Sequence, residues 1–210
     1  MPVVAQNSRR SSRSLNLKGV DYEYRVVNLL NAEQKKPEYL EMNPRGMVPL
    51  LDFDGKKLSD SVAIMEFLEE KFPDKCSFLP KTPEDRAVVR SLVHMITADI
   101  QPVQNMRVIK FVGQGDAEKT ATFARHFIDL GFESLEKELA KTAGKFAFGD
   151  SITMADIVIP AQVHNARRFG VDMAKFPIIS RINETLASLP EFIKADAFHQ
   201  PDTPESDRRP

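Results

Sequence analysis

The chain has 210 residues, of which 42% are hydrophobic and 28% charged, and its formal net charge is −1. A chain of this length forms one large domain or two small ones, and these proportions are typical of a globular protein. The balanced charge gives no reason to expect nucleic acid or an acidic membrane surface as a partner. No apolar run reaches the roughly 18–20 residues of a membrane span. The single cysteine, Cys76, excludes an internal disulfide and favours a reducing compartment.

The first part of the chain contains short and mixed elements. It begins with MPVVAQNSRRSSRS, which is basic, rich in serine and without the apolar core of a signal peptide. Tyr22, Tyr24 and Val26 alternate with polar neighbours, and this period of two predicts a strand. Glu33–Met42 predicts a short helical or irregular segment that ends before Pro44.

The most informative stretch is Asn43–Pro73, which predicts two strands and a helix in succession. Val48–Phe53 is apolar except for one aspartate, as in a buried strand. Asp54-Gly55 is typical of a two-residue hairpin turn of type I′, because both central residues of that turn have positive φ. Lys56–Leu58 predicts the returning strand. Apolar residues at helical spacing follow: Val62, Met65, Leu68 and Phe72.

The start of that helix and the strand before it are suited to holding a small anionic peptide. Asp60 or Ser61 lies at the helix start, where a short oxygen-bearing side chain accepts a free backbone N–H. The unpaired N–H groups and the positive end of the helix dipole also favour a ligand carboxylate. Because Pro49 has no N–H, Val48 is the residue whose backbone could pair with a peptide. The alternative is an ordinary ββα unit with a proline in an edge strand.

After Pro83 the chain changes to an almost entirely helical pattern. The predicted helices are Glu84–Lys110 with a kink at Pro102, Glu118–Thr142, Thr153–Arg168, Ile178–Leu189 and a short helix after Pro190. We therefore divide the chain into a mixed domain, residues 1–80, and an all-helical domain, residues 83–210.

Thr153 and Asp156 form a Thr-x-x-Asp motif at the start of one predicted helix. The Thr153 hydroxyl can accept the N–H of residue 156, while the Asp156 carboxylate accepts the N–H of residue 153. The functional alternative for Asp156 is a catalytic acid. We predict instead that Asp156 has a structural role in capping the helix. Loss of this cap should lower the free energy of unfolding by on the order of 1 kcal/mol or more.

Together these features resemble the cytosolic glutathione transferases, and more narrowly their zeta class, whose members act as maleylacetoacetate isomerases. The resemblance runs from about Leu15 to Pro204. The matching segments are Leu17–Tyr24, Asn43-Pro44, Val48-Pro49, Ser61–Ile64, Ile100–Asn105, Gly149-Asp150, Thr153–Asp156, Arg168-Phe169, Val171-Asp172 and Gln200–Pro204. The runs Ile-Gln-Pro-x-Gln-Asn and Gln-Pro-Asp-Thr are more specific to the zeta class than the other segments.

The resemblance implies an α+β thioredoxin-like N-terminal domain followed by an all-α domain, assembled as a homodimer. It implies glutathione as the cofactor and no metal ion. By the same resemblance, Ser61 holds the γ-glutamyl carboxylate, Val48 pairs with the cysteinyl backbone, and Gln34 lies near the glycine end. Asp60 stands where the family usually has Gln or Glu. The contacts implied for the helical domain are Gln101, Asn105, Met106 and Arg107.

Arg168 matches an arginine that the family uses for the carboxylates of its substrate. A guanidinium suits a dicarboxylate because it offers a fixed fork of donors. The alternative is a solvated charge at a helix end.

The N-terminal region departs from the family, whose thiolate-stabilising serine lies before the first helix in an Arg-Ser-Ser-Cys-x-Trp-Arg motif. In an alignment without gaps from Lys18, the serine position falls near Gln6, which has no hydroxyl. In an alignment that matches Arg10-Ser11-Ser12 to the Arg-Ser-Ser of this motif, the catalytic serine is Ser11 or Ser12, but part of the first helix is missing. The alternative that we favour is a disordered basic arm, with an incomplete first strand and helix.

The function that this resemblance implies is the glutathione-dependent isomerisation of maleylacetoacetate to fumarylacetoacetate, a cytoplasmic step of phenylalanine and tyrosine catabolism. One alternative is a general glutathione transferase that acts on small α-halo acids. Another is a catalytically impaired protein that keeps the fold and acts by binding.

Overall fold

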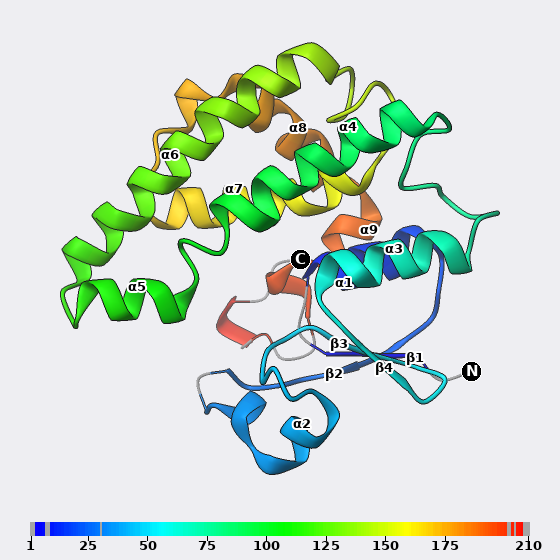
Figure 1. Cartoon of the computed structure of the whole chain (residues 1–210), viewed down its shortest axis with the longest axis vertical. Coiled ribbons are helices and arrows are strands. Elements are labelled where there is room, and N and C mark those ends of the chain that lie inside the picture. Colours follow the sequence, from blue (N-terminus) through cyan, green and yellow to red (C-terminus); the bar gives the residue numbers. More distant parts are fainter. Residues whose placement is uncertain (1–2, 7–8, 30, 201–202, 204, 208–210) are drawn as a thin grey trace. The chain divides into compact units, whose positions relative to one another are not determined.

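The computed structural model in Figure 1 describes residues 3–6, 9–29, 31–200, 203 and 205–207. The structure divides into two compact units, one of Met1–Ser77 together with Leu189–Pro210 and one of Phe78–Ser188. The sequence predicts that the end of the chain belongs to the helical domain, whereas the structure groups it with the first unit.

The packing of α9, Pro190–Ile193, accounts for this grouping. It lies against α1, Arg9–Leu17, in the first unit. The Asn16 side-chain amide donates to the backbone oxygen of Glu191 at 2.9 Å. Phe192, which is 3% exposed, lies under the Arg13 guanidinium at 5.3 Å from the ring centre.

The first unit contains a four-stranded sheet of order β2-β1-β3-β4. Its strands are β1, Val3–Gln6; β2, Glu23–Arg25; β3, Leu50–Phe53; and β4, Lys56–Ser59. β1 is parallel to β2 and antiparallel to β3, and β3 is antiparallel to β4. Asp54 and Gly55 join β3 to β4 with φ values of 56° and 85°, which confirms the predicted hairpin turn.

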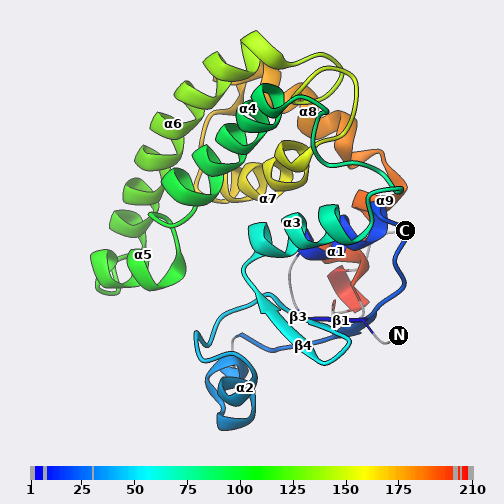
Figure 2. The same cartoon turned by 45° about the vertical axis from the view of Figure 1, so that its right-hand side comes forward.

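Helices cover both faces of this sheet. In Figures 1 and 2, α1 and α3, Ser61–Lys71, lie on one face, and α2, Pro37–Met42, lies on the other. The short helix η1, Glu33–Lys35, precedes α2. Leu50 and Leu51 point to opposite faces because side chains alternate along a strand. They are 2% and 0% exposed, so β3 is the buried strand that its apolar sequence predicted.

The expectation of an incomplete first strand and helix, or of a disordered basic arm, is wrong. β1 lies between β2 and β3, so its backbone has hydrogen-bonding partners on both sides. α1 forms although serine is a poor helix former, because the helix buries one face against α3 and α9. Ser14 and Leu15 on that face are 0% exposed, and the Ser14 hydroxyl donates to the Arg10 backbone oxygen at 2.8 Å.

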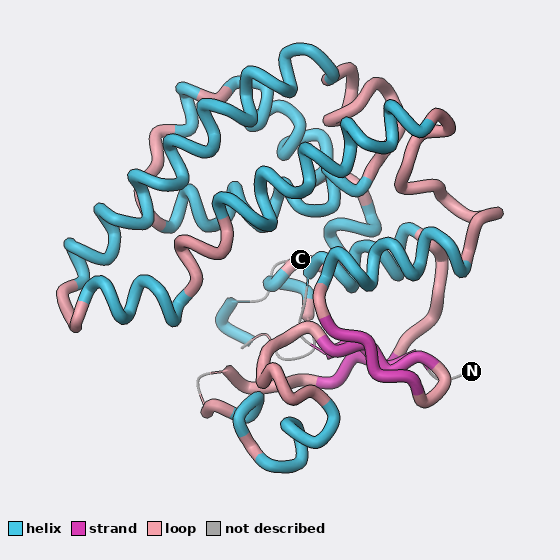
Figure 3. Tube along the Cα trace, in the orientation of Figure 1, coloured by secondary structure: helices cyan, strands magenta, loops and turns pink. Residues whose placement is uncertain are grey.

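The second unit consists of helices joined by loops in its described part (Figure 3). Its helices are α4, Pro83–His94; η2, Met95–Ile100; α5, Met106–Gly113; α6, Ala117–Thr142; α7, Met154–Arg168; η3, Met173–Lys175; and α8, Pro177–Ala187. Helix α7 packs against α4, α6 and α8, and Met154–Ile159 is buried throughout. No helix among the described residues combines the length and the apolar character needed to cross a membrane.

The prediction of one kinked helix over Glu84–Lys110 is wrong. Helix α4 continues into η2, a π-helix, and the chain then turns at Gln101 before α5 starts. The turn follows from Pro102, which has no N–H to continue a helical hydrogen-bond pattern. Gln101 N–H still reaches the Ile96 oxygen at 2.9 Å, five residues back, as in a π-helix.

The capping box at the start of α7 is confirmed. Both of its reciprocal halves are present, and the Thr153 N–H donates to the Asp156 carboxylate at 2.8 Å. The Ala147 N–H donates to the other Asp156 oxygen at 2.8 Å, so this carboxylate also holds the preceding loop. Asp156 is 0% exposed, and burial raises its pKa to about 6. These contacts identify Asp156 as a structural residue.

Candidate functional site

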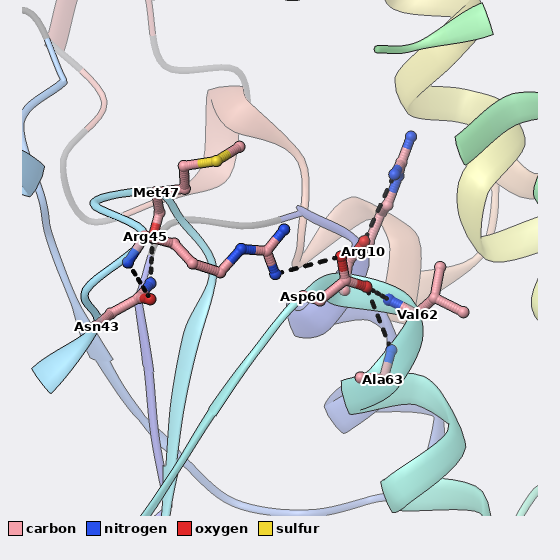
Figure 4. Close-up of polar contacts among 8 residues, drawn as sticks. Arg10, Asn43, Arg45, Met47, Asp60, Val62 and Ala63 are labelled. Carbon is pink, nitrogen blue, oxygen red and sulfur yellow. Dashed lines mark hydrogen bonds and ion pairs between the residues drawn. The ribbon is translucent and has the colours of Figure 1, made fainter. Parts of the chain in front are cut away.

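The start of α3 is formed by Asp60, whose backbone adopts a positive φ of 81°. One carboxylate oxygen of Asp60 accepts the N–H of Val62 at 2.9 Å and that of Ala63 at 3.4 Å (Figure 4). These bonds confirm the predicted helix start. They use two of the free N–H groups of the first turn, so a ligand anion here must also draw on neighbouring side chains.

Arg10 of α1 supplies such a side chain. Its Nη1 atom donates to the Ser61 hydroxyl oxygen at 3.5 Å, and its guanidinium lies beside Asp60. Burial lowers the pKa of Arg10 to about 10, while the negative charge of Asp60 acts in the opposite direction. Within the described part of the chain, Arg10 forms no salt bridge with a carboxylate, so the charge of this partly buried cation is available to an anionic partner.

Arg45 approaches the same place from the loop before β3. Its Nη1 atom lies 3.7 Å from the second carboxylate oxygen of Asp60. The loop is held by Asn43, which is 3% exposed: its side-chain amide donates to the Met47 oxygen at 2.7 Å and its amide oxygen accepts the Arg45 N–H at 3.3 Å. Figure 4 shows the Arg45 side chain directed toward Asp60, while the Arg10 guanidinium is hydrogen-bonded to the next residue, Ser61. The three charges together suit a ligand that carries both an anion and a cation.

Val48 follows in the same loop, before a cis peptide bond to Pro49. Its side chain packs against the buried cluster of Val27, Tyr39 and Leu50. Among the residues that the structure describes, neither the N–H nor the carbonyl of Val48 has a backbone partner. The side chain is therefore packed and partly buried, while the main chain is able to pair with an extended peptide.

Gln34 lies in η1, on the other side of that loop. A Cβ built on Gly46, whose φ is 55°, would lie only 3.1 Å from the Gln34 backbone oxygen and 3.0 Å from Leu40. Gly46 thus allows the η1–α2 segment to pack closely against the loop. In this way the first unit brings Gln34 and Val48 to the loop that reaches Asp60 through Arg45.

Ser11 and Ser12 do not occupy the position expected for thiolate-stabilising residues. Both lie inside α1 and are 1% exposed. The Ser12 hydroxyl is hydrogen-bonded to that of Tyr22, whose pKa is raised by burial. This burial argues against an alignment that presents them to a ligand. The residues that join β1 to α1, and the side chain of Gln6, lie outside the described part of the structure.

The residues expected from the helical unit fall in two places. Gln101 and Asn105 lie between η2 and α5, and Met106 and Arg107 are the first two residues of α5. Asn105 caps α5, since its side-chain oxygen accepts the Arg107 N–H at 3.2 Å. Arg168 is exposed at the end of α7, with its guanidinium 5.4 Å from the ring centre of Phe169. Among the described residues, no cluster of side chains suits a metal ion.

Arg10 and Arg45 were not found from the sequence. Arg10 stands in a run of arginines and serines whose pattern alone does not indicate which side chain turns inward. Arg45 lies within Asn43–Pro73, but no spacing rule links it to Asp60. To identify Arg10, one must know which face of α1 is buried, and that face is known only once the helix itself is known.

The chain matches the family models described as glutathione S-transferase, N-terminal domain, over residues 7–71, and glutathione S-transferase, C-terminal domain, over residues 104–195. It is 44% identical over 193 residues to maleylacetoacetate isomerase of Dictyostelium discoideum, and the alignment covers 90% of this chain and 88% of the relative.

Two solved structures resemble the whole chain. One is a bacterial maleyl pyruvate isomerase, described as a zeta-class glutathione S-transferase, with a TM-score of 0.91, 34% identity, and coverage of 97% of this chain and 100% of that one. The other is maleylacetoacetate isomerase of Anaeromyxobacter dehalogenans, with dicarboxyethyl glutathione and citrate bound in its active site. Its TM-score is 0.85 at 35% identity, and the match covers 97% of this chain and 98% of that one.

Proposed function

Because the chain belongs to the zeta class of the glutathione S-transferases, we propose that it converts maleylacetoacetate to fumarylacetoacetate by cis–trans isomerisation, with glutathione as its cofactor. The observation that carries this proposal is the cationic site at the start of α3. There the Arg10 guanidinium meets the Ser61 hydroxyl, and no described carboxylate forms a salt bridge with Arg10. A guanidinium and a hydroxyl together offer several donors to the oxygens of a carboxylate.

The charges at this site fit the γ-glutamyl end of glutathione, which carries an α-carboxylate and an α-ammonium group. Arg10 and Ser61 bind the carboxylate, with the dipole of α3 behind them. Asp60 binds the ammonium group, and Arg45 keeps that carboxylate oriented. A site with both signs of charge favours a zwitterionic amino-acid head over a simple carboxylic acid.

The remaining contacts extend along the peptide. The free main-chain groups of Val48 pair with the cysteinyl residue, as an added strand pairs with a sheet edge. Gln34 contacts the glycine end. In the helical unit we propose four further glutathione contacts: Gln101, Asn105, Met106 and Arg107.

Glutathione bound in this way supplies a thiolate, which adds to the conjugated double bond of the substrate, allows rotation and leaves again. The chain has to position the peptide and to hold the substrate, which carries a carboxylate at each end. We propose that Arg168 binds one of those carboxylates, since its guanidinium is exposed and offers paired donors. The citrate and the dicarboxyethyl group in the Anaeromyxobacter dehalogenans structure support a dicarboxylate as substrate.

The setting of the activity belongs to the same proposal. The chain acts in the cytoplasm as a homodimer, in the catabolism of phenylalanine and tyrosine. Its similarity to the maleylacetoacetate isomerase of Dictyostelium discoideum supports the reaction on which this setting depends.

One observation favours a second function. Because Ser11 and Ser12 are buried, neither hydroxyl is available to stabilise a thiolate, and the chain would then bind glutathione without efficient turnover. Transfer of glutathione to α-halo acids is the other reaction that the same site could support.

Maleylacetone, an analogue of the substrate, separates these functions. Purified protein should remove the absorbance of the cis isomer only when glutathione is present. Product formed from chlorinated acids alone would support the transferase, and retention on immobilised glutathione without turnover would support the binding protein. A folded protein that neither removes the cis isomer in the presence of glutathione nor binds immobilised glutathione would refute the proposal.

A further inference from the structure

Gln104 and Gln162 form a buried amide pair in the second unit. Gln104 is 4% exposed and Gln162 is 0% exposed. The Gln104 Nε2 atom donates to the Gln162 Oε1 atom at 2.8 Å. Gln104 belongs to the turn between η2 and α5, and Gln162 belongs to α7, so the bond ties a turn to the central helix of the unit.

Two of the four side-chain polar atoms of this pair are unpaired within the described structure. Within the described structure, the Gln104 oxygen and the Gln162 nitrogen have no hydrogen-bond partner. A buried amide group without a partner costs more free energy than one hydrogen bond returns. Two apolar side chains of similar volume would fill the same space without that cost. The half-paired amides therefore stabilise the unit less than apolar side chains would, and the feature that distinguishes the pair is its single directional bond between the turn and α7.

The turn that carries Gln104 has few ties of its own. Pro102 donates no backbone hydrogen bond, and the Asn105 N–H reaches the Pro102 oxygen at a long 3.3 Å. Upstream, Ile100 is fixed against α6, where a Cβ on Gly131 would lie only 2.3 Å from the Ile100 Cγ1 atom. Downstream, Asn105 caps α5. Between these two fixed points, Gln104 is the side chain that anchors the turn.

We infer that Gln104 and Gln162 are positioning residues for glutathione binding. Neither of the two is proposed to contact glutathione directly. They fix the turn so that Gln101 and Asn105, which precede and follow Gln104, present their amides in one arrangement. This inference rests on the proposed function, because it takes these two residues as glutathione contacts.

Methionine replacements separate positioning from packing, because methionine matches glutamine in length and has no strong hydrogen-bonding group. Gln104→Met and Gln162→Met each leave one buried amide without its partner, so each should lower the melting temperature. The double variant removes both amides and should recover much of the loss. Its dissociation constant for glutathione, measured by calorimetry, should nevertheless stay about tenfold weaker than that of the wild-type chain, the equivalent of one hydrogen bond.

A third substitution tests the coupling. Gln101→Ala should weaken glutathione binding in the wild-type background and have no further effect in the double methionine variant, because the turn is already mispositioned there. Leu186→Ala is the control for lost stability, since Leu186 is a 0% exposed residue of α8. Below its melting temperature it should bind glutathione as the wild type does.

The outcomes are distinct. Wild-type affinity in the double variant, or an additive effect of Gln101→Ala, would show that the pair only packs the unit, and the inference would fail while the proposed function stands. If the double variant does not fold, the two single methionine variants provide the test. The inference is overturned if their affinity for glutathione falls no more than that of Leu186→Ala. Absence of glutathione binding by the wild-type chain would overturn both the proposed function and the inference.

Discussion

The Nη1 atom of Arg10 lies 3.5 Å from the hydroxyl oxygen of Ser61, 51 residues further along the chain. This contact joins the first turn of α1 to the first turn of α3. Although burial lowers the pKa of Arg10 to about 10, the guanidinium stays protonated at neutral pH. The start of α3 therefore carries a fixed positive charge next to a hydroxyl, and this charge is the basis of the proposed glutathione site.

Replacement of Arg10 by methionine should weaken the binding of glutathione. A hydrogen bond to a charged group contributes about 1.5–3 kcal/mol, so the KM for glutathione should rise about 10- to 100-fold. The maximal rate should change much less, because the γ-glutamyl end is bound equally in the ground state and in the transition state. Steady-state kinetics with maleylacetone at varied glutathione concentrations measures both quantities.

Arg9→Met is the matched control for that variant. Arg9 lies in the same helix, and its guanidinium is 3.9 Å from Asp196 of the C-terminal segment rather than at α3. The control removes the same charge and should leave the KM close to that of the wild type. Equal effects of the two substitutions would show that general charge, rather than the Arg10–Ser61 contact, attracts glutathione.

Ser11→Ala and Ser12→Ala should both retain the isomerase activity. Each hydroxyl is buried in α1, so neither can reach a bound thiol without the helix unfolding. Ser12→Ala removes a hydrogen bond to Tyr22 and should lower the free energy of unfolding by about 1 kcal/mol. A large loss of the maximal rate in either variant, at an unchanged melting temperature, would restore the serine to the catalytic site.

Asp156 should make stability depend on pH. Burial raises its pKa in the folded state to about 6, above the ordinary value of 3.8. The folded state therefore binds the proton more tightly than the unfolded state, so this contribution to stability is fully present below the ordinary pKa and is lost as the pH rises through about 6.

Denaturant unfolding of the wild type and of Asp156→Asn across this range measures the effect. The asparagine keeps the shape and does not titrate, so the free energy of unfolding of the wild type should fall relative to the variant as the pH rises. The total change should be at most about 3 kcal/mol. A difference that stays constant with pH would contradict the raised pKa.

Lys18→Met should destabilise the first unit strongly. Lys18 is 1% exposed, and its ammonium group donates to Glu69 at 2.7 Å and to the Phe72 oxygen at 3.1 Å. Removing one partner of a buried ion pair costs about 3–5 kcal/mol, because the other charge remains buried. Chemical denaturation measures the loss. Lys57→Met, which breaks the more exposed pair with Asp52, is the control and should cost about 1 kcal/mol or less. Similar losses in both variants would contradict the difference in burial.

The local signals in the sequence predicted the elements that depend on neighbouring residues. The Asp54-Gly55 turn, the Asp60 helix start and the capping box of Asp156 all follow from side chains within a few positions. The resemblance to the zeta class rests on runs of this kind, and the comparisons with known proteins confirm it.

The failures have a common physical cause, which is packing between distant parts of the chain. Serine and arginine in the first residues argued against a helix, but α1 is stabilised by contacts with α3 and α9. The same contacts bury Ser11 and turn Arg10 toward Ser61. The π-helix before Pro102 likewise depends on α6, because Gly131 leaves room for Ile100. None of these relations is visible in a period of two or of 3.6 residues.

Titration of the wild-type chain with glutathione in a calorimeter tests the central claim most directly. We predict saturable heat with one site per chain at millimolar glutathione or below, and little or none when γ-glutamyl is replaced by an acyl group that has the carboxylate but lacks the ammonium. A well-folded sample that gives no heat of association with glutathione would contradict the account.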